Sequence, residues 1–350
     1  MLNMKLQEVF DSYKENILPT YTKVPLVFVK GKGSYIWDIH NKKYLDFFPG
    51  WGVGNLGHFH PKVMQAVRDQ VSKLIFIPNN YYHPPQAKLA SQIVAWSYPA
   101  KVFFCNSGAE ANEAAIKFSR KFGKGRHEII TFENSFHGRT LAALAATGQK
   151  KYQAGFEPLP EGFKTVPFND IEAVKKAITD KTVAIMLELI QGEGGVNVAK
   201  RDFVLELRKI CDEKNMLLIV DEVQTGIART GKAFCYQQYG ITPDIMTLAK
   251  ALGGGLPIGM MVAKKEIADT LGPGMHASTF GGSPLVCRAA MAVLNAMQKE
   301  KILKNTNVMG EYLFLKLEKL KNKYPVIKEI RGLGLMAGVE LNVAGKTIVE

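Results

Sequence analysis

Between positions 100 and 265, short apolar runs alternate with segments of helical periodicity. Six runs have the length and composition of buried strands: 100–105 (AKVFFC), 127–132 (HEIITF), 183–190 (VAIMLELI), 216–222 (MLLIVDE), 245–250 (IMTLAK) and 258–263 (IGMMVA). Between two of them, Phe203, Leu207 and Ile210 lie on one stripe of a helix. Strands that are apolar along their whole length must be buried on both faces of their sheet, and the amphipathic helices between them can cover those faces. The pattern therefore predicts an α/β fold, with a mostly parallel sheet between two layers of helices.

The chain of 350 residues is longer than one typical core requires. We expect an N-terminal segment over residues 1–45, a large domain over 46–285 and a small α+β domain over 286–350. The last of these contains two helical patterns followed by the short apolar run "GLMAGVEL".

The formal net charge is +13, from 45 basic and 32 acidic residues. The bases are interspersed with acids, as in "RDFVLELRKICDEKN", which favours attraction of small anions over a nucleic-acid surface. No apolar run reaches the ~18 residues of a membrane span, and the first residues lack a signal-peptide core. We expect a cytoplasmic protein with no nucleic-acid or membrane partner.

Polar residues follow three of the predicted strands. The first is followed by Ser107 and Gly108, another ends in Asp221, and a third ends in Lys250. In doubly wound sheets, ligands bind beyond the carboxyl ends of the strands. We therefore expect these side chains to meet at one site.

The segment "NSGAEANE" leaves a strand and opens a helix. The first-turn N–H groups of a helix have no partner within it and can hold an anion such as a phosphate, and Gly108 would let that anion approach the backbone. The alternative is a simple capping box between Ser107 and Glu110.

Asp221 ends an apolar run, so its carboxylate needs a cation, either a protein base or a protonated ring nitrogen of a ligand. The alternative is a strand-end Asp that caps a turn. Lys250 also follows an apolar run, and apolar surroundings lower the pKa of an amine. A phosphate site, a buried carboxylate and a buried lysine are together what pyridoxal 5'-phosphate requires.

Two competing motifs are weaker. "GIARTGKA" matches a P-loop except that Ala233 stands where Ser or Thr should bind magnesium. His58 and His60 have no third ligand nearby in sequence, and the four cysteines form no C-x-x-C pair. We expect no metal site.

Six motifs, "NSGAEANEAAIKFSRK", "SFHGRT", "IQGEGG", "DEVQTGIARTG", "LAKALGGGLPIG" and "STFGGSPL", occur in this order. In sequence and spacing the chain resembles the class III (ω-amino) pyridoxal-phosphate aminotransferases over nearly its whole length. The resemblance implies a fold-type I transferase. Two stretches, "ATGQKKYQAGFEPLPEGF" and "YLDFFPGWGVGNLGHFHP", are most similar to the branch of arginine biosynthesis that converts N-acetylornithine and 2-oxoglutarate to N-acetylglutamate semialdehyde and glutamate.

Alternatives remain at this point. Within the class, the amino donor could be ornithine, succinylornithine, succinyldiaminopimelate or 4-aminobutyrate. Outside it, the chain could be a non-catalytic basic binding protein that kept the fold.

The resemblance also assigns roles to residues. Lys250 would bind the cofactor covalently and transfer the substrate proton, and Asp221 would pair with the ring nitrogen. Cofactor contacts fall on Ser107, Gly108, Ala109, Phe136, Asp221, Val223, Gln224, Lys250 and Thr279, and substrate contacts on Arg139, Glu193 and Tyr21. Thr279 would reach the phosphate of a partner subunit, which implies a homodimer with shared active sites.

In the family, the glutamate at Glu193 pairs with an arginine of the C-terminal lobe. The sequence ends at Glu350, before that arginine would occur. We therefore expect this 350-residue form to have weaker use of glutamate and 2-oxoglutarate, and lower stability, than a longer form.

Overall fold

The computed structural model describes residues 5–345 and contains a central seven-stranded sheet. Its strands lie in the order β4 (Ala100–Cys105), β12 (Gly259–Lys264), β11 (Ile245–Leu248), β10 (Leu217–Asp221), β7 (Thr182–Leu187), β5 (Glu128–Phe132) and β6 (Phe163–Val166). Only β12 runs antiparallel to its neighbours. The predicted α/β fold and mostly parallel sheet are confirmed, and β6 is a strand that the sequence did not predict.

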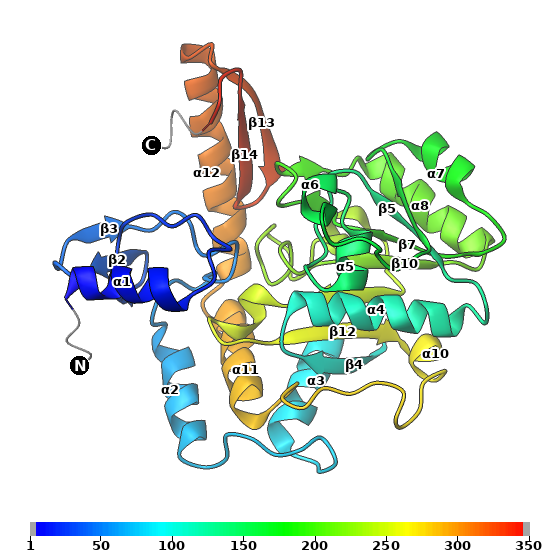
Figure 1. The fold of residues 1–350 in the computed structure, drawn as a ribbon, viewed down its shortest axis with the longest axis horizontal. Coiled ribbons are helices and arrows are strands. Elements are labelled where there is room, and N and C mark those ends of the chain that lie inside the picture. The colour runs from blue at the N-terminus through cyan, green and yellow to red at the C-terminus, as the bar shows by residue number, and fades with distance from the viewer. Residues whose placement is uncertain (1–4, 346–350) are drawn as a thin grey trace.

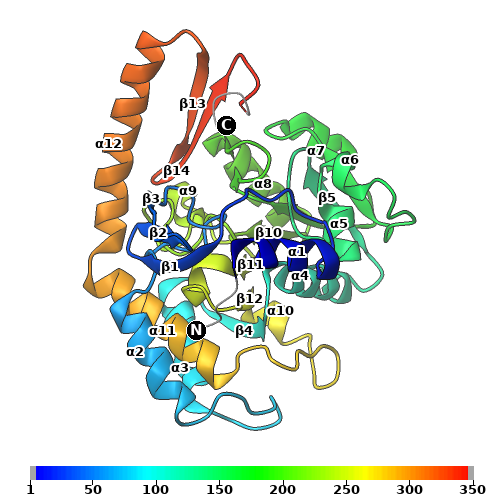
Figure 2. The ribbon, with the colours of Figure 1, turned by 60° about the vertical axis from the view of Figure 1, so that its left-hand side comes forward.

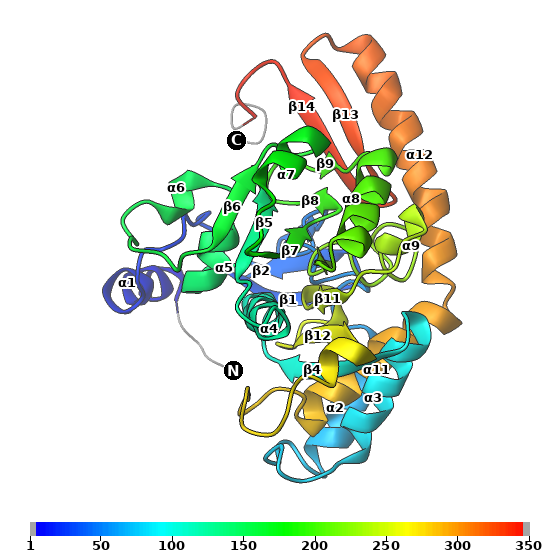
Figure 3. The ribbon, with the colours of Figure 1, turned by 90° about the vertical axis from the view of Figure 1, so that its right-hand side faces the viewer.

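Helices cover both faces of this sheet, as Figure 3 shows. Helix α4 (Gly108–Phe122) packs on one face, and α3 (Pro84–Trp96), α8 (Arg201–Glu213) and α11 (Pro284–Lys299) belong to the core of the other. In β7, Ala184 and Met186 belong to the hydrophobic core that contains α4 residues, whereas Ile185 and Leu187 belong to the core that contains α8 residues. Because both faces are buried, the strands are apolar without alternation. Each fully buried large side chain contributes roughly 1.5–3 kcal/mol.

Smaller elements surround the sheet (Figure 1). An N-terminal antiparallel sheet contains β1 (Phe28–Lys32), β2 (Tyr35–Asp38) and β3 (Lys43–Leu45), and β8 (Ile190–Gln191) pairs with β9 (Asn197–Val198). Further helices among the described residues before the C-terminal part are α1 (Leu6–Asn16), α2 (Pro61–Val71), α5 (Leu141–Ala146), α6 (Lys150–Gln153), α7 (Ile171–Ala177), α9 (Tyr236–Tyr239) and α10 (Lys265–Ala268).

The C-terminal part consists of the long helix α12 (Ile302–Lys323) and a hairpin of β13 (Ile327–Leu333) and β14 (Met336–Leu341), which stand beside the large sheet in Figure 2. The α+β character matches the prediction for this region, whereas α11 packs against α2 and α3. The domain limits at 45 and 285 stay a prediction. Within residues 5–345, no helix is both long and apolar enough to span a bilayer.

Two predicted strands end at least two residues earlier than the sequence suggested. The run 183–190 forms β7 only as far as Leu187, and Glu188 and Leu189 separate it from β8. The run 245–250 forms β11 only as far as Leu248, and Lys250 begins a 3₁₀ helix, η1 (Lys250–Gly253). Both differences place a charged side chain beyond the end of its strand.

Candidate active site

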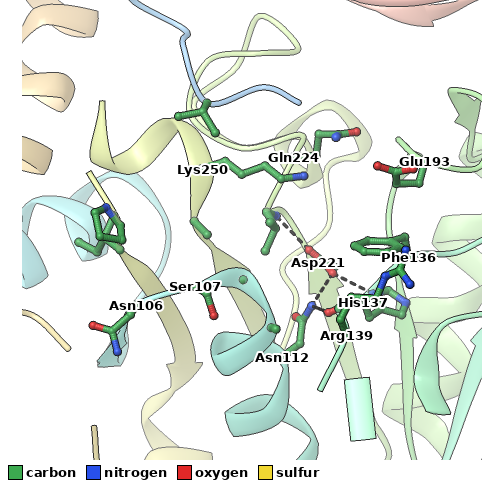
Figure 4. A pocket seen from close by; sticks show the side chains of 18 of the residues that line it. Asn106, Ser107, Asn112, Phe136, His137, Arg139, Glu193, Asp221, Gln224 and Lys250 are labelled. Atoms are coloured by element: carbon green, nitrogen blue, oxygen red, sulfur yellow. Dashed lines mark hydrogen bonds and ion pairs between the residues drawn. The ribbon is translucent and has the colours of Figure 1, made fainter. Parts of the chain in front are cut away.

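Four adjacent parallel strands, β11, β10, β7 and β5, deliver polar side chains to one edge of the sheet. Lys250 follows β11, Asp221 ends β10, Glu188 follows β7 and His137 lies in the loop after β5. All four line a cavity of about 480 Å³ (Figure 4). The start of α4, after β4, closes another side of it.

Asp221 is 4% exposed and accepts three hydrogen bonds. Its Oδ1 accepts from the Val223 N–H at 3.0 Å, and its Oδ2 accepts from Asn112 Nδ2 and His137 Nδ1, each at 2.8 Å. The carboxylate therefore caps a turn, as the alternative reading expected, and its pairing with a protonated ring nitrogen stays a prediction. His137 Nε2 is buried and has no partner among the described residues.

Asn112 connects three elements beneath the cavity. Its Nδ2 also donates to the His137 carbonyl at 2.7 Å, and its Oδ1 accepts from Thr247 Oγ1 at 2.7 Å. Because Asn112 is on α4 and Thr247 is on β11, the network fixes the Asp221 carboxylate relative to both.

Lys250 reaches into the cavity from the wall opposite Glu193 and Phe136 (Figure 4). Its φ of +43° lies in the left-handed region, which costs about 1–3 kcal/mol for a residue other than glycine. Burial lowers the pKa of its ammonium group, although the nearby carboxylates of Asp221 and Glu188 oppose this. A lower pKa leaves more of the amine unprotonated and nucleophilic at neutral pH.

At the start of α4, Ser107 caps the helix, but the reciprocal bond of a capping box is replaced by one from the residue before the cap. Ser107 Oγ accepts from the Glu110 N–H at 3.2 Å, and the Glu110 carboxylate accepts from the Asn106 N–H at 2.7 Å. Gly108 and Ala109 line the cavity, and the first-turn N–H groups of a helix have no acceptor within it. A Cβ on Gly108 would lie 2.7 Å from Val223 Cγ1, so glycine lets these two walls approach.

The polar residues predicted to contact substrate or cofactor lie along the rim. Arg139 is exposed, with its Cζ 3.9 Å from the ring centroid of Tyr152 and 5.6 Å from that of Phe136. Gln224 Nε2 donates to the Trp51 carbonyl at 3.2 Å. Glu193 lines the cavity and is exposed.

Two predicted site residues lie outside the cavity. Thr279 is exposed in the loop before α11, and Tyr21 is 69% exposed in the N-terminal segment. The role given to Thr279 requires a second subunit. Both assignments stay predictions.

Three residues of the site were missed in the sequence: Glu188, His137 and Asn112. Glu188 had a detectable signal, because it is the only charged residue in the run "VAIMLELI". Burial raises the pKa of this carboxyl group to about 7, and Asp221 also raises it, while His137 acts in the opposite direction. Perturbed carboxyl groups of this kind are common at functional sites.

Comparison with known proteins assigns the fold and the site to a family. The family model for class III aminotransferases matches residues 17–350. The acetylornithine aminotransferase of Methanocaldococcus jannaschii is 54% identical over 99% of this chain and 88% of its own length. That of Caldanaerobacter subterraneus is 52% identical, over 94% of this chain and 85% of its own.

Solved structures of aminotransferases have the same fold as this chain. The ornithine aminotransferase of Toxoplasma gondii superposes with a TM-score of 0.93 at 34% identity, covering 97% of this chain and 83% of that one. The acetylornithine aminotransferase of Elizabethkingia anophelis has a TM-score of 0.86 at 33% identity, covering 97% and 85%. The chain therefore belongs to the class III aminotransferases, enzymes that transfer amino groups with pyridoxal 5'-phosphate as cofactor.

Proposed function

We propose that this enzyme transfers the δ-amino group of N-acetylornithine to 2-oxoglutarate, giving N-acetylglutamate semialdehyde and glutamate, a step of arginine biosynthesis. Eight curated acetylornithine aminotransferases are 46–54% identical to it over 93–99% of the chain. The observation that supports this chemistry is that Lys250, Asp221 and the start of α4 converge on one cavity.

The residues of the cavity fit the cofactor. Gly108 and Ala109 offer a helix N-terminus to its phosphate, and the glycine at position 108 lets the start of α4 lie close against Val223. Asp221 offers a buried carboxylate, already fixed by Asn112 and His137, to a protonated ring nitrogen. When bound, pyridoxal 5'-phosphate supplies an electron sink for charge at the substrate carbon.

Each of these residues has a distinct task. Lys250 Nζ is the group that bonds the cofactor between turnovers and moves the substrate proton, which its lowered pKa favours. Asp221 would keep the ring nitrogen protonated, and Phe136 and Val223, which line the cavity, would hold the ring between them. Gln224 would hydrogen-bond the ring hydroxyl.

We assign the substrate carboxylate to Arg139. Among the described residues its guanidinium contacts aromatic rings and forms no ion pair, so both N–H edges can serve an anionic ligand. Glu193 lies on the same cavity and Tyr21 is on the N-terminal segment, and we assign both to substrate binding.

The working unit would be a cytoplasmic homodimer. Asn79 donates to the carbonyls of Ser278 and Gly281, each at 3.0 Å, which joins two loops that expose large aromatic side chains. Tyr82 is fully exposed and Phe280 is 62% exposed. Exposed aromatic side chains beside Thr279 are what a subunit interface would cover. Sedimentation of the holoenzyme as a monomer would contradict this assignment.

The decisive test is the visible spectrum of purified holoenzyme before and after N-acetylornithine is added, with glutamate formation from 2-oxoglutarate measured in parallel. We expect the absorbance of the bound cofactor to bleach with this donor, and a Lys250→Ala variant to bind the cofactor without turnover. A spectrum that responds to free ornithine or 4-aminobutyrate and not to N-acetylornithine would reassign the donor. Wild-type protein that binds no cofactor would contradict the active site itself.

A further inference from the structure

Glu188 connects two segments of the active site through a single carboxylate. The side chain directly follows β7 and is 6% exposed. Its Oε2 accepts from the Phe136 N–H at 2.8 Å, and its Oε1 accepts from the Gly192 N–H at 3.2 Å. Each oxygen therefore holds a different segment, the loop after β5 and the turn after β8.

The turn that begins at Gly192 has little freedom. A Cβ on Gly192 would lie 1.3 Å from Gln224 Oε1, so this backbone lies directly against the Gln224 amide. At the far end of the turn, Arg331 Nε donates to the Gly195 carbonyl at 2.9 Å. Glu193 therefore lies between two residues that are held by hydrogen bonds: Gly192, held by Glu188, and Gly195, held by Arg331.

We propose that Glu188 is a positioning residue: its carboxylate fixes the Phe136 ring and the Gly192–Glu193 turn relative to each other, and so sets the width of the substrate entrance. This inference rests on the proposed function, because Phe136 and Glu193 are the groups that would contact cofactor and substrate.

The geometry favours an ionised carboxylate, since both partners are N–H donors. The charged groups that face it are His137 from the loop after β5, Asp221 from β10, and Lys250 after β11. Burial raises the pKa of Glu188 to about 7. Above that pH both oxygens accept, whereas below it one oxygen carries a proton and holds its N–H less well. The contribution of Glu188 to turnover is therefore present above pH 7 and lost as the pH falls through it.

The chain contains a matched control in Glu222. This carboxyl group is also buried, and burial raises its pKa to about 7 as well. It accepts from the Tyr236 N–H at 2.7 Å and from the Thr225 hydroxyl at 2.5 Å. A glutamine fits there, because a hydroxyl can accept from the new amide N–H₂. At position 188 both partners are backbone N–H groups, so a glutamine must direct its N–H₂ at one of these donors and loses that hydrogen bond.

The experiment compares wild-type, Glu188→Gln and Glu222→Gln holoenzymes, with kcat and KM for N-acetylornithine measured from pH 6 to pH 9. For Glu188→Gln we expect bound cofactor, a KM at pH 8.5 raised at least 10-fold, and loss of the acid limb of kcat/KM near pH 7. Glu222→Gln should keep that limb and a kcat/KM within 3-fold of wild type. Glu188→Gln with the wild-type limb and KM within 2-fold would overturn the proposal.

A second measurement needs no variant. Amide hydrogen exchange of the wild-type holoenzyme, corrected for intrinsic rates, should show Phe136 or Gly192 exchanging at least 10-fold faster at pH 6 than at pH 8. Equal protection at both pH values would also overturn the proposal. Turnover of the wild-type enzyme tests the proposed function separately. If another amino donor is the substrate, kcat and KM of the three enzymes are compared with that donor. If no donor is turned over, the exchange measurement still tests the role of Glu188.

Discussion

His137 Nδ1 and Asp221 Oδ2 lie 2.8 Å apart, and neither side chain has appreciable contact with solvent. The imidazole is held at its other edge only by packing, because Nε2 has no partner among the described residues. His137 therefore directs its Nδ1–H at the carboxylate and keeps the remaining lone pairs of Asp221 aimed toward the cavity. Through this hydrogen bond His137 can set the affinity for the cofactor by orienting Asp221.

Replacing His137 with phenylalanine should weaken cofactor binding. The change removes a hydrogen bond to a charged acceptor, worth roughly 1.5–3 kcal/mol, so we expect the Kd of pyridoxal 5'-phosphate to rise about 10- to 100-fold. Titration of apoenzyme with cofactor, followed by visible absorbance, measures it. The control is His127→Phe, at an exposed histidine directly before β5, at the opposite end of that strand from His137. A Kd within 2-fold of wild type would show that Asn112 and Val223 suffice to hold Asp221.

Gly108→Ala should disturb the phosphate cradle through Val223. The new Cβ would lie 2.7 Å from Val223 Cγ1, closer than real Cβ contacts allow, and 3.0 Å from Cγ2, which is also tight. We expect the cofactor Kd to rise at least 10-fold, and adding Val223→Ala to recover part of that loss in a double-mutant cycle. Gly272→Ala is the control, because a Cβ there meets nothing within 4 Å. If the changes in cofactor Kd caused by Gly108→Ala and Val223→Ala simply add in free energy, the two side chains do not interact.

Much of the site could be predicted from the order of apolar runs, because parallel strands bring their carboxyl ends to one edge. Asp221 and Lys250 could be identified in this way from the sequence alone. Glu188 was missed, since an acid in "VAIMLELI" was taken as part of the strand, while in the structure the strand ends at Leu187.

The partners of Asp221 could not be predicted in this way. Asn112 and His137 are 109 and 84 positions away from it, and they meet it only because the strand order places β10 beside β11 and β7, beneath α4. Strand order depends on packing between elements that are distant in sequence, and residue spacing does not encode it. Ser107 shows a different limit, because one residue serves as a helix cap and lines the cavity as well.

Arg139→Lys should affect substrate binding more than the chemical step. A planar guanidinium holds a carboxylate with two parallel hydrogen bonds, and an ammonium group cannot reproduce that geometry. We expect the KM for the amino donor to rise about 10-fold or more, with kcat changed less, in steady-state assays at saturating 2-oxoglutarate. Arg201→Lys serves as the control, because Arg201 donates to the Gln238 carbonyl and does not line the cavity. An unchanged KM would place the substrate carboxylate elsewhere.

Glu222 should make the stability of the protein depend on pH. Burial raises the pKa of this carboxyl group from its ordinary 4.5 to about 7, so the folded state holds its proton more tightly than the unfolded chain does. The resulting stabilisation is complete below pH 4.5 and is lost as the pH rises through 7. The difference of 7 − 4.5 = 2.5 pH units corresponds to at most about 3 kcal/mol.

Glu222→Gln removes this titration and keeps an acceptor for Tyr236 and a donor for Thr225. We therefore expect the free energy of unfolding of the variant, relative to wild type, to increase between pH 5 and pH 8, by up to about 3 kcal/mol. Urea unfolding of the two apoproteins at pH 5, 6.5 and 8 measures this difference, in which contributions shared by both proteins, including that of Glu188, cancel. If the difference between the two proteins is the same at all three pH values, Glu222 does not titrate in this range, and its carboxylate is stabilised in the folded state by the Tyr236 N–H and the Thr225 hydroxyl more than burial opposes it.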